Sequence, residues 1–496
     1  MLKKLSVALL LVAALAAGVR AQNAGTVITN ASMAMGVNNL TSITYSGTAR
    51  NGAFGQSKAL GDPLGTVNNT QITNYTRTIN FGAAAAPTDL AARTSGVTQP
   101  APTADIPSPM PGALNQNITG AQATGNFGQA LNILTSPWGF LKAAAANNAT
   151  ARAQGGQQVV SFTPAGFMSP SGLTYTVTGY INNQNLVTKV ETRVDNAVVG
   201  DLLTEFEYSN YANRGGVQVP GRIVMKQAGL TSFEATITAA TPNPTDLVAL
   251  LTPPPAPARG GGPGGPPGGA RAGGPPPAPP VEMIAAGVFK IGGGYQSLAI
   301  DMGDHILVAE SGQSEARGLA TMAAAKAAIP GKPIRFVTTS HGHFDHASGL
   351  AAAVAEGATI LAHRNTEPAL ERFLSGPRTL VGDSLSKVAN RRTNVVEPVG
   401  DRDVRRGTNG RVVELIHVPN EHTDGLIVVY LPADKIMHTG DITANNPTPA
   451  QVGVVKSWVA VATRLNLDYN TWIPVHAPNP DVPMTKADVT RAVGTN

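Results

Sequence analysis

Three histidines and an aspartate stand within six residues, in the segment His341-Gly342-His343-Phe344-Asp345-His346. This spacing fits neither one face of a helix nor one face of a strand, so the side chains converge only if the segment is a short loop. The run 333–339 just before it predicts a strand that leads into this loop. Four such groups would be costly to bury without a ligand, and imidazole nitrogen with carboxylate oxygen suits zinc, iron or manganese. The sequence therefore predicts a metal site.

Three more candidate ligands lie further along the chain, each next to an apolar run. All nine histidines of the protein follow residue 300. His422 precedes the run 426–430, Asp441 follows Thr439-Gly440 after another run, and His476 closes the run 471–475. Because α/β sheets present reactive groups where strands end, we expect these side chains to join the hexapeptide at one edge.

This ordered set of motifs resembles the metallo-β-lactamase superfamily, from about Val281 to the C-terminus. The resemblance implies an αβ/βα sandwich with two metal ions at the edge of its sheets. It implies that one ion is held by His341, His343 and His422, a second by Asp345, His346 and His476, and that Asp441 bridges them. One departure is visible, because the strand that usually ends in Asp-x-Gly reads Ala309-Glu310-Ser311-Gly312. We expect this change to affect loop geometry more than metal binding.

Two such cations would make a hydroxide available near neutral pH. We expect them to be Zn²⁺, with iron or manganese as alternatives. We expect Asp345 both to bind metal and to orient this hydroxide, so no protein nucleophile is required. The predicted reaction is hydrolysis of an ester, thioester, lactone, amide or phosphoester.

The family contains several branches, and the sequence excludes some of them for this chain. The chain has no cysteine, which excludes the lactamase classes that use a thiolate ligand. A cysteine-free lactamase class exists, but it lacks the bridging aspartate. Thr439-Gly440-Asp441 instead resembles the branch of glyoxalase II-like thioesterases, lactonases and phosphodiesterases. That branch also holds mononuclear iron persulfide dioxygenases, so such an enzyme is the alternative.

Two residues beside the ligands are candidates for supporting or substrate-binding roles. Ser340 adjoins a ligand, and His438 stands three residues before Asp441. A packing role for His438 is an equal alternative. We interpret His305, His363 and His417 as structural or solvated.

The N-terminus predicts export. A basic start, an apolar run over residues 5–17 and small residues before Gln22 indicate a signal peptide, residues 1–21, cut after Ala21. The predicted location is periplasmic or secreted, and no later segment predicts a transmembrane helix. The basic stretch 391–406 lacks interleaved aromatic residues and contains aspartates, so nucleic-acid binding is not predicted.

The segment 252–280 is almost wholly Pro, Gly, Ala and Arg and predicts a linker. It separates an N-terminal domain, residues 22–251, from the predicted hydrolase domain, residues 281–496. The latter shows helical patterns over 316–328, 347–355, 365–374 and 484–493. We expect the piece from Val281 onward to hydrolyse simple esters or thioesters of small molecules by itself.

The N-terminal domain has period-two alternation at 174–181, 186–194, 202–208 and 222–226, which predicts a mostly antiparallel β fold. A helix is expected at 31–37, and long loops at 83–120 and 143–157. A helix followed by a meandering sheet is loosely similar to the half-barrel of outer-membrane lipoprotein carriers, which implies a hydrophobic ligand on the concave face. A binding protein with an auxiliary metal domain is therefore the second alternative.

Overall fold

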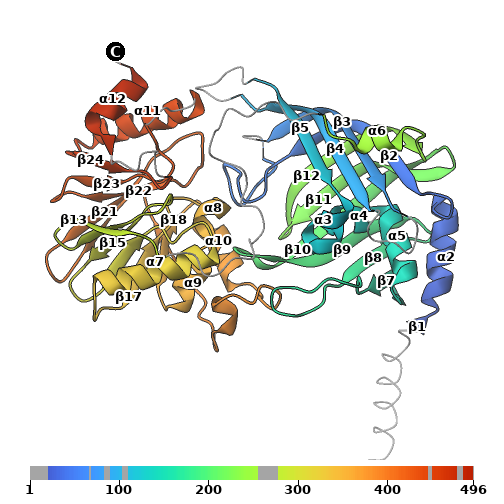
Figure 1. Cartoon of the computed structure of the whole chain (residues 1–496), viewed down its shortest axis with the longest axis horizontal. Coiled ribbons are helices and arrows are strands. Elements are labelled where there is room, and N and C mark those ends of the chain that lie inside the picture. Colours follow the sequence, from blue (N-terminus) through green and yellow to red (C-terminus); the bar gives the residue numbers. More distant parts are fainter. Residues whose placement is uncertain are drawn as a thin grey trace, which may run out of the picture.

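The computed structural model describes residues 21–65, 69–82, 90–102, 110–254, 278–444, 449–476 and 484–494. These residues form an N-terminal domain built on one curved sheet and a C-terminal domain built on two sheets (Figure 1). Most of the predicted signal peptide, residues 1–20, and most of the predicted linker, residues 255–277, lie outside the described residues. Among the described helices, none has the length and apolar character needed to cross a membrane.

Among the described residues, the N-terminal sheet has twelve strands, and each neighbouring pair is antiparallel. This confirms the predicted antiparallel β fold. In spatial order the strands are β1 (Ala21–Gln22), β6 (Thr150–Gln154), β7 (Gln157–Phe162), β8 (Val177–Ile181), β9 (Val187–Asn196), β10 (Gly200–Arg214), β11 (Val217–Gln227), β12 (Leu230–Pro242), β2 (Ser42–Asn51), β3 (Thr70–Asn80), β4 (Ala91–Pro100) and β5 (Gly112–Ile118).

Helices pack inside the curve of this sheet (Figure 1). They are α3 (Gly120–Gly125), α4 (Phe127–Leu134) and α5 (Pro137–Ala146). The helix α2 (Ala24–Met35) lies beside α5 at the end of the domain, and a short α6 (Leu247–Leu251) follows β12. The side chains of Asn126 and Ser136 cap α4 and α5, and a proline at the first turn favours the start of α5. Trp138 and Phe140 on α5 are fully buried and anchor the core against the sheet.

Two expectations for this domain were wrong. The segments expected to be long loops contain the whole of β4, β5 and β6. These strands carry mainly Ala, Thr, Asn and Gln, and β5 is largely exposed at the sheet edge, so backbone pairing rather than an apolar pattern forms them. The first helix begins at Ala24, earlier than expected, because the Asn23 side chain accepts a hydrogen bond from Thr26 N and caps it.

The C-terminal domain is the predicted αβ/βα sandwich. One sheet contains β13 (Val281–Ala285), β14 (Val288–Ile291), β15 (Ser297–Asp301), β16 (Ile306–Ala309), β17 (Ile334–Thr338), β18 (Thr359–His363) and β19 (Val396–Val399). The other contains β20 (Arg402–Arg406), β21 (Val412–His417), β22 (Ile427–Leu431), β23 (Ile436–His438), β24 (Thr471–Ile473) and β25 (Met484–Thr485). An apolar cluster that includes Leu298, Leu307 and Val429 joins the two sheets.

Helices cover the outer face of each sheet (Figure 1). The first sheet is covered by α7 (Glu315–Ala328), α9 (Leu350–Ala355) and α10 (Glu367–Ser375), with α8 (Phe344–Ala347) before α9 and a 3-10 turn η2 (Leu385–Lys387) after α10. The second is covered by α11 (Pro449–Arg464) and α12 (Lys486–Val493). The helix α11 was not predicted. Its Trp458 is buried and packs edge-to-face on Trp472, so this helix contributes to the core of the second sheet.

The two domains share a packed interface. The β2–β3 loop, residues 52–65, carries Leu60 into the core of the first C-terminal sheet, and Phe54 packs edge-to-face on Phe344 with ring centres 5.4 Å apart. On the other side, the buried Arg378 donates to the backbone carbonyls of Ala197 and Val198. These contacts fix the β2–β3 loop against the segment that carries the predicted metal ligands.

Candidate metal centre

The seven predicted ligands lie together at one edge of the sandwich. The loop after β17 supplies His341 and His343, and α8 supplies Asp345 and His346. The loops after β21, β23 and β24 supply the other three, which are His422, Asp441 and His476.

Two glycines allow the ligand loops to approach one another. A Cβ atom on Gly342 would lie 2.6 Å from Thr366 Cγ2 and 2.8 Å from Leu60 Cδ2, so only glycine fits between the two histidines. Gly440 has a φ of +60°, and its Cβ would lie 2.6 Å from that of Ser340. The glycines in the His-Gly-His and Thr-Gly-Asp motifs are therefore required by close packing.

Three ring nitrogens converge to form the first group of ligands. His341 Nε2 lies 3.0 Å from His343 Nδ1 and 3.2 Å from His422 Nε2. A tetrahedral zinc ion with Zn–N bonds of about 2.0–2.1 Å has ligand atoms about 3.3 Å apart. The three nitrogens therefore have the spacing of one face of such a site.

The second group combines two carboxylates and two histidines. His476 Nε2 lies 3.3 Å from both Asp345 Oδ2 and Asp441 Oδ1, and His346 Nε2 lies 3.0 Å from the same Asp441 oxygen. The other Asp441 oxygen, Oδ2, is 3.3 Å from His422 Nε2 in the first group. Asp441 therefore stands between the groups, with one oxygen turned to each.

The tautomer of His343 is fixed by the N-terminal domain. The His343 Nε2–H donates to the backbone carbonyl of Ser57, at 3.2 Å. Because a carbonyl only accepts, this bond leaves the lone pair of Nδ1 free and directed at the first group. A loop almost three hundred residues away in sequence thus prepares a metal ligand.

The same β2–β3 loop also holds Asp345. Gln56 Nε2 donates to Asp345 Oδ1 at 2.9 Å, while the other oxygen of this carboxylate faces the second group. Beyond Gln56, the Lys58 ammonium pairs with Glu421 at 2.7 Å, and the Lys58 carbonyl accepts from Asp424 N. Gln56 and Ser57 were missed by sequence reasoning, because no local motif marks them.

Glu310 supports His346 from behind. Its side chain is fully buried, accepts from Ser340 N at 2.7 Å and from the Tyr295 hydroxyl at 2.8 Å, and lies 3.5 Å from His346 Nδ1. Its φ of +68° is unusual for a residue with a side chain. Glu310, the residue that departs from the usual Asp-x-Gly, therefore holds a buried carboxylate beside the ligand His346.

Ser340 and His438 occupy different positions. The Ser340 hydroxyl lies 3.0 Å from His341 Nδ1, on the side of the ring away from the first group. His438 is buried and donates from Nε2 to the Gln296 carbonyl at 3.0 Å, outside both ligand groups. His363 and His417 stack on each other with ring centres 3.8 Å apart, and His305 pairs with Asp304, so these three lie apart from the ligand groups.

The two ligand groups differ in charge. Burial, followed by repulsion from His422, lowers the pKa of His343 to about 3, and burial likewise holds the pKa of His341 well below its ordinary value. Burial alone would lower the pKa of His346, but Asp441 and Glu310 raise it well above the ordinary value. His341 and His343 are thus neutral imidazoles, whereas the second group holds the two carboxylates, one of which stabilises the protonated form of His346.

These residues fit a pair of divalent cations. Among the described residues, the buried atoms His346 Nε2 and Asp441 Oδ1 have no hydrogen-bond partner, although they face each other inside the second group. Buried polar atoms of this kind require a ligand. Neutral nitrogens and carboxylate oxygens at these spacings are a donor set suited to zinc.

Comparison with known families agrees with this geometry. Residues 297–476 match the sequence model described as the metallo-beta-lactamase superfamily, a range that includes all seven ligands. The C-terminal domain is a member of the metallo-beta-lactamase superfamily. This confirms the resemblance inferred from the motifs. Members of this superfamily are generally hydrolases.

Several solved structures are similar to part of this chain. A metallo-beta-lactamase from Pontibacter korlensis is 16% identical, with 43% of this chain and 97% of that chain covered and a TM-score of 0.32. One from Hirschia baltica is 20% identical, with 43% and 96% covered and a TM-score of 0.31. The inverting sec-alkylsulfatase Pisa1 from Pseudomonas sp. is 17% identical, with 43% and 40% covered and a TM-score of 0.31. No curated protein sequence matches the chain.

Proposed function

We propose that the protein is an exported hydrolase that uses two divalent metal ions, with zinc the first choice, to cleave an ester, thioester, lactone, amide or phosphoester. The position of Asp441 carries the proposal. Its Oδ2 lies 3.3 Å from His422 Nε2 and its Oδ1 lies 3.0 Å from His346 Nε2, so one carboxylate serves both ligand groups. Together with the absence of cysteine, this favours the glyoxalase II-like and lactonase-like branch. Export rests on the signal-peptide pattern of residues 1–21.

Two divalent ions bound there would lower the pKa of a water molecule and polarise the bond under attack. A role for Asp345 in orienting the attacking water is supported by Gln56, which holds its Oδ1 while its Oδ2 faces the site. Burial alone would raise the pKa of Asp345, but the His476 ring and His346 hold it well below the usual range. Asp345 therefore remains a carboxylate that accepts a hydrogen bond from the water.

Substrate approaches from the exposed side of the centre. The His476 side chain is 51% exposed and that of His422 is 33% exposed, whereas those of His341 and His346 are fully buried. The Ser340 hydroxyl lies behind His341 and is bonded to its Nδ1, so it is not positioned as a nucleophile. The attack is therefore assigned to water, with the ligands at the exposed edge facing the substrate.

The test is metal content of the purified mature protein by elemental analysis, together with hydrolysis of a thioester, a lactone, a phosphodiester and a β-lactam. We expect two zinc ions per chain and turnover of a thioester, lactone or phosphodiester. D441N should lose at least one ion and the activity, whereas D304N, at an exposed aspartate far from the centre, should retain both. A single iron without hydrolysis would overturn the proposal in favour of a dioxygenase. A protein that binds no metal after loading would leave a binding function.

A further inference from the structure

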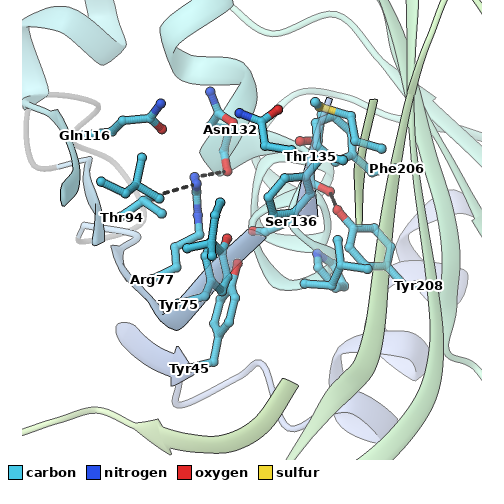
Figure 2. Close-up of a pocket in the computed structure, with 17 residues that line it drawn as sticks. Tyr45, Tyr75, Arg77, Thr94, Gln116, Asn132, Thr135, Ser136, Phe206 and Tyr208 are labelled. Atoms are coloured by element: carbon cyan, nitrogen blue, oxygen red, sulfur yellow. Dashed lines mark hydrogen bonds between the residues drawn. The ribbon is translucent and has the colours of Figure 1, made fainter. Parts of the chain in front are cut away.

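The N-terminal domain contains a cavity of about 180 Å³ between its curved sheet and the α4–α5 turn. Figure 2 shows that the lining residues come from the strands on one side and from the helices on the other. Aromatic and aliphatic side chains, including Ile72, Phe206 and Phe233, form much of the wall. An engineered apolar cavity of about 150 Å³ accepts a benzene molecule, so this space is large enough for one ring or a short acyl chain.

One residue of the wall is charged. Arg77, on β3, is the single side chain among the seventeen described lining residues that carries a charge at neutral pH. Its guanidinium donates to Thr94 Oγ1 at 3.1 Å and to the Asn132 carbonyl at 2.8 Å, and both bonds are drawn as dashed lines in Figure 2. Both acceptors are neutral. Within the described part of the chain, Arg77 forms no ion pair with a carboxylate.

The surroundings of Arg77 favour an anion. The neighbouring lining groups that can ionise are tyrosines, and burial first of all raises the pKa of Tyr45 and of Tyr208, so both remain neutral phenols. A partly buried positive charge without a counter-ion is unfavourable, and a guanidinium has five N–H donors suited to a carboxylate or phosphate. The two bonds to neutral acceptors do not exhaust these donors.

We propose that this cavity binds a small amphiphilic acid, with its anionic head on Arg77 and its apolar body against the aromatic wall. This site is separate from the metal centre and goes beyond the proposed hydrolase function. It also refines the expected hydrophobic ligand, because a neutral lipid would leave the charge of Arg77 uncompensated. Fatty acids and aromatic carboxylic acids share this chemistry.

The experiment is isothermal titration calorimetry of the full-length mature protein with octanoate, benzoate and the uncharged analogue 1-octanol. We expect octanoate to bind one-to-one and about tenfold or more tightly than 1-octanol, as loss of a charge-assisted hydrogen bond predicts. Benzoate distinguishes a preference for rings from one for acyl chains. Because a metal centre also attracts carboxylates, the titration is repeated after metal removal, and the octanoate affinity should persist.

Variants locate the site. R77M should weaken octanoate binding about tenfold or more and leave 1-octanol binding within about threefold, while R77K should retain much of the affinity for octanoate. R93M is the matched control, since Arg93 lies on the adjacent strand β4, bonds to Asn115 and Leu250 and does not line the cavity. Equal binding of octanoate and 1-octanol, unchanged octanoate binding in a folded R77M, or no binding by the wild type would each overturn the proposal.

Discussion

Substitution of Gln56 by leucine tests whether the N-terminal domain helps to build the metal centre. Gln56 is exposed, and its amide donates to Asp345 Oδ1 at 2.9 Å from a different domain. Leucine has a similar size and lacks the donor. The variant therefore removes one contact to a ligand while the backbone carbonyl of Ser57 still accepts from His343.

The expected size of the effect follows from the position of this hydrogen bond. A hydrogen bond to a charged group contributes about 1.5–3 kcal/mol when buried, and a typical neutral one about 0.5–1.5 kcal/mol. Because Gln56 is exposed to solvent, we take the lower range. Since about 1.4 kcal/mol corresponds to a tenfold change, Q56L should weaken metal binding about two- to tenfold.

The assay is competition for Zn²⁺ between the full-length protein and a chromophoric chelator, with the hydrolytic rate measured in parallel. If Asp345 belongs to a second site that fills independently, Q56L should lower the affinity for the more weakly bound zinc ion and leave the affinity for the other ion unchanged. Q71L is the control, because Gln71 is also exposed but bonds to Asn69, away from the centre. Equal zinc affinities and rates for Q56L and the wild type would refute a positioning role for this amide.

The isolated C-terminal domain would lack the contacts that the β2–β3 loop makes with the metal centre. A piece from Val281 onward would lack both the Gln56 amide and the Ser57 carbonyl, and it would expose the apolar surface that packs on Leu60. We expect this piece to bind metal more weakly and to hydrolyse substrate more slowly than the full chain. Full activity of the isolated piece would show that the β2–β3 loop only covers the centre.

Three further predictions concern other buried groups. E310Q should weaken metal binding about 10- to 100-fold by chelator competition, because the amide no longer offers Ser340, Tyr295 and His346 a charged acceptor. R378M should lower the free energy of unfolding by about 3–5 kcal/mol, since it leaves the buried Asp383 unpaired, whereas R364M at an exposed pair should change it by about 1 kcal/mol or less, as measured by urea unfolding. Burial, then the stacked His417, lowers the pKa of His363 to about 4, below the unfolded value of about 6.5. As the pH falls from 6.5 to 4, the His363 ring therefore takes up a proton in the unfolded state before it does so in the folded state, which lowers the free energy of unfolding. In the metal-free protein, H363F should lose less stability over this pH range than the wild type, as measured by urea unfolding.

Much of the C-terminal domain could be predicted because its signals are local. Each candidate ligand adjoins a short apolar run, and the hexapeptide His341–His346 contains four of the seven. A strand followed by a loop is determined by neighbouring residues, and the order of the motifs resembles a known family, which implied the fold and the two groups of ligands. The helix α11 was missed because its sequence is rich in valine and contains Gly453, residues of low helix propensity, and because its burial depends on packing against Trp472.

The sequence by itself determined which side chains could hold metal, because coordination chemistry is set by residue type and spacing. Tertiary structure alone decided what surrounds them. Gln56 and Ser57 reach Asp345 and His343 only because the β2–β3 loop packs against the C-terminal core through Leu60. Likewise, the strands of the N-terminal sheet that lack an apolar pattern form through pairing with distant neighbours, and the same pairing places Arg77 in a cavity. Contacts between residues far apart in sequence leave no local pattern, and for this reason they appear only in the folded chain.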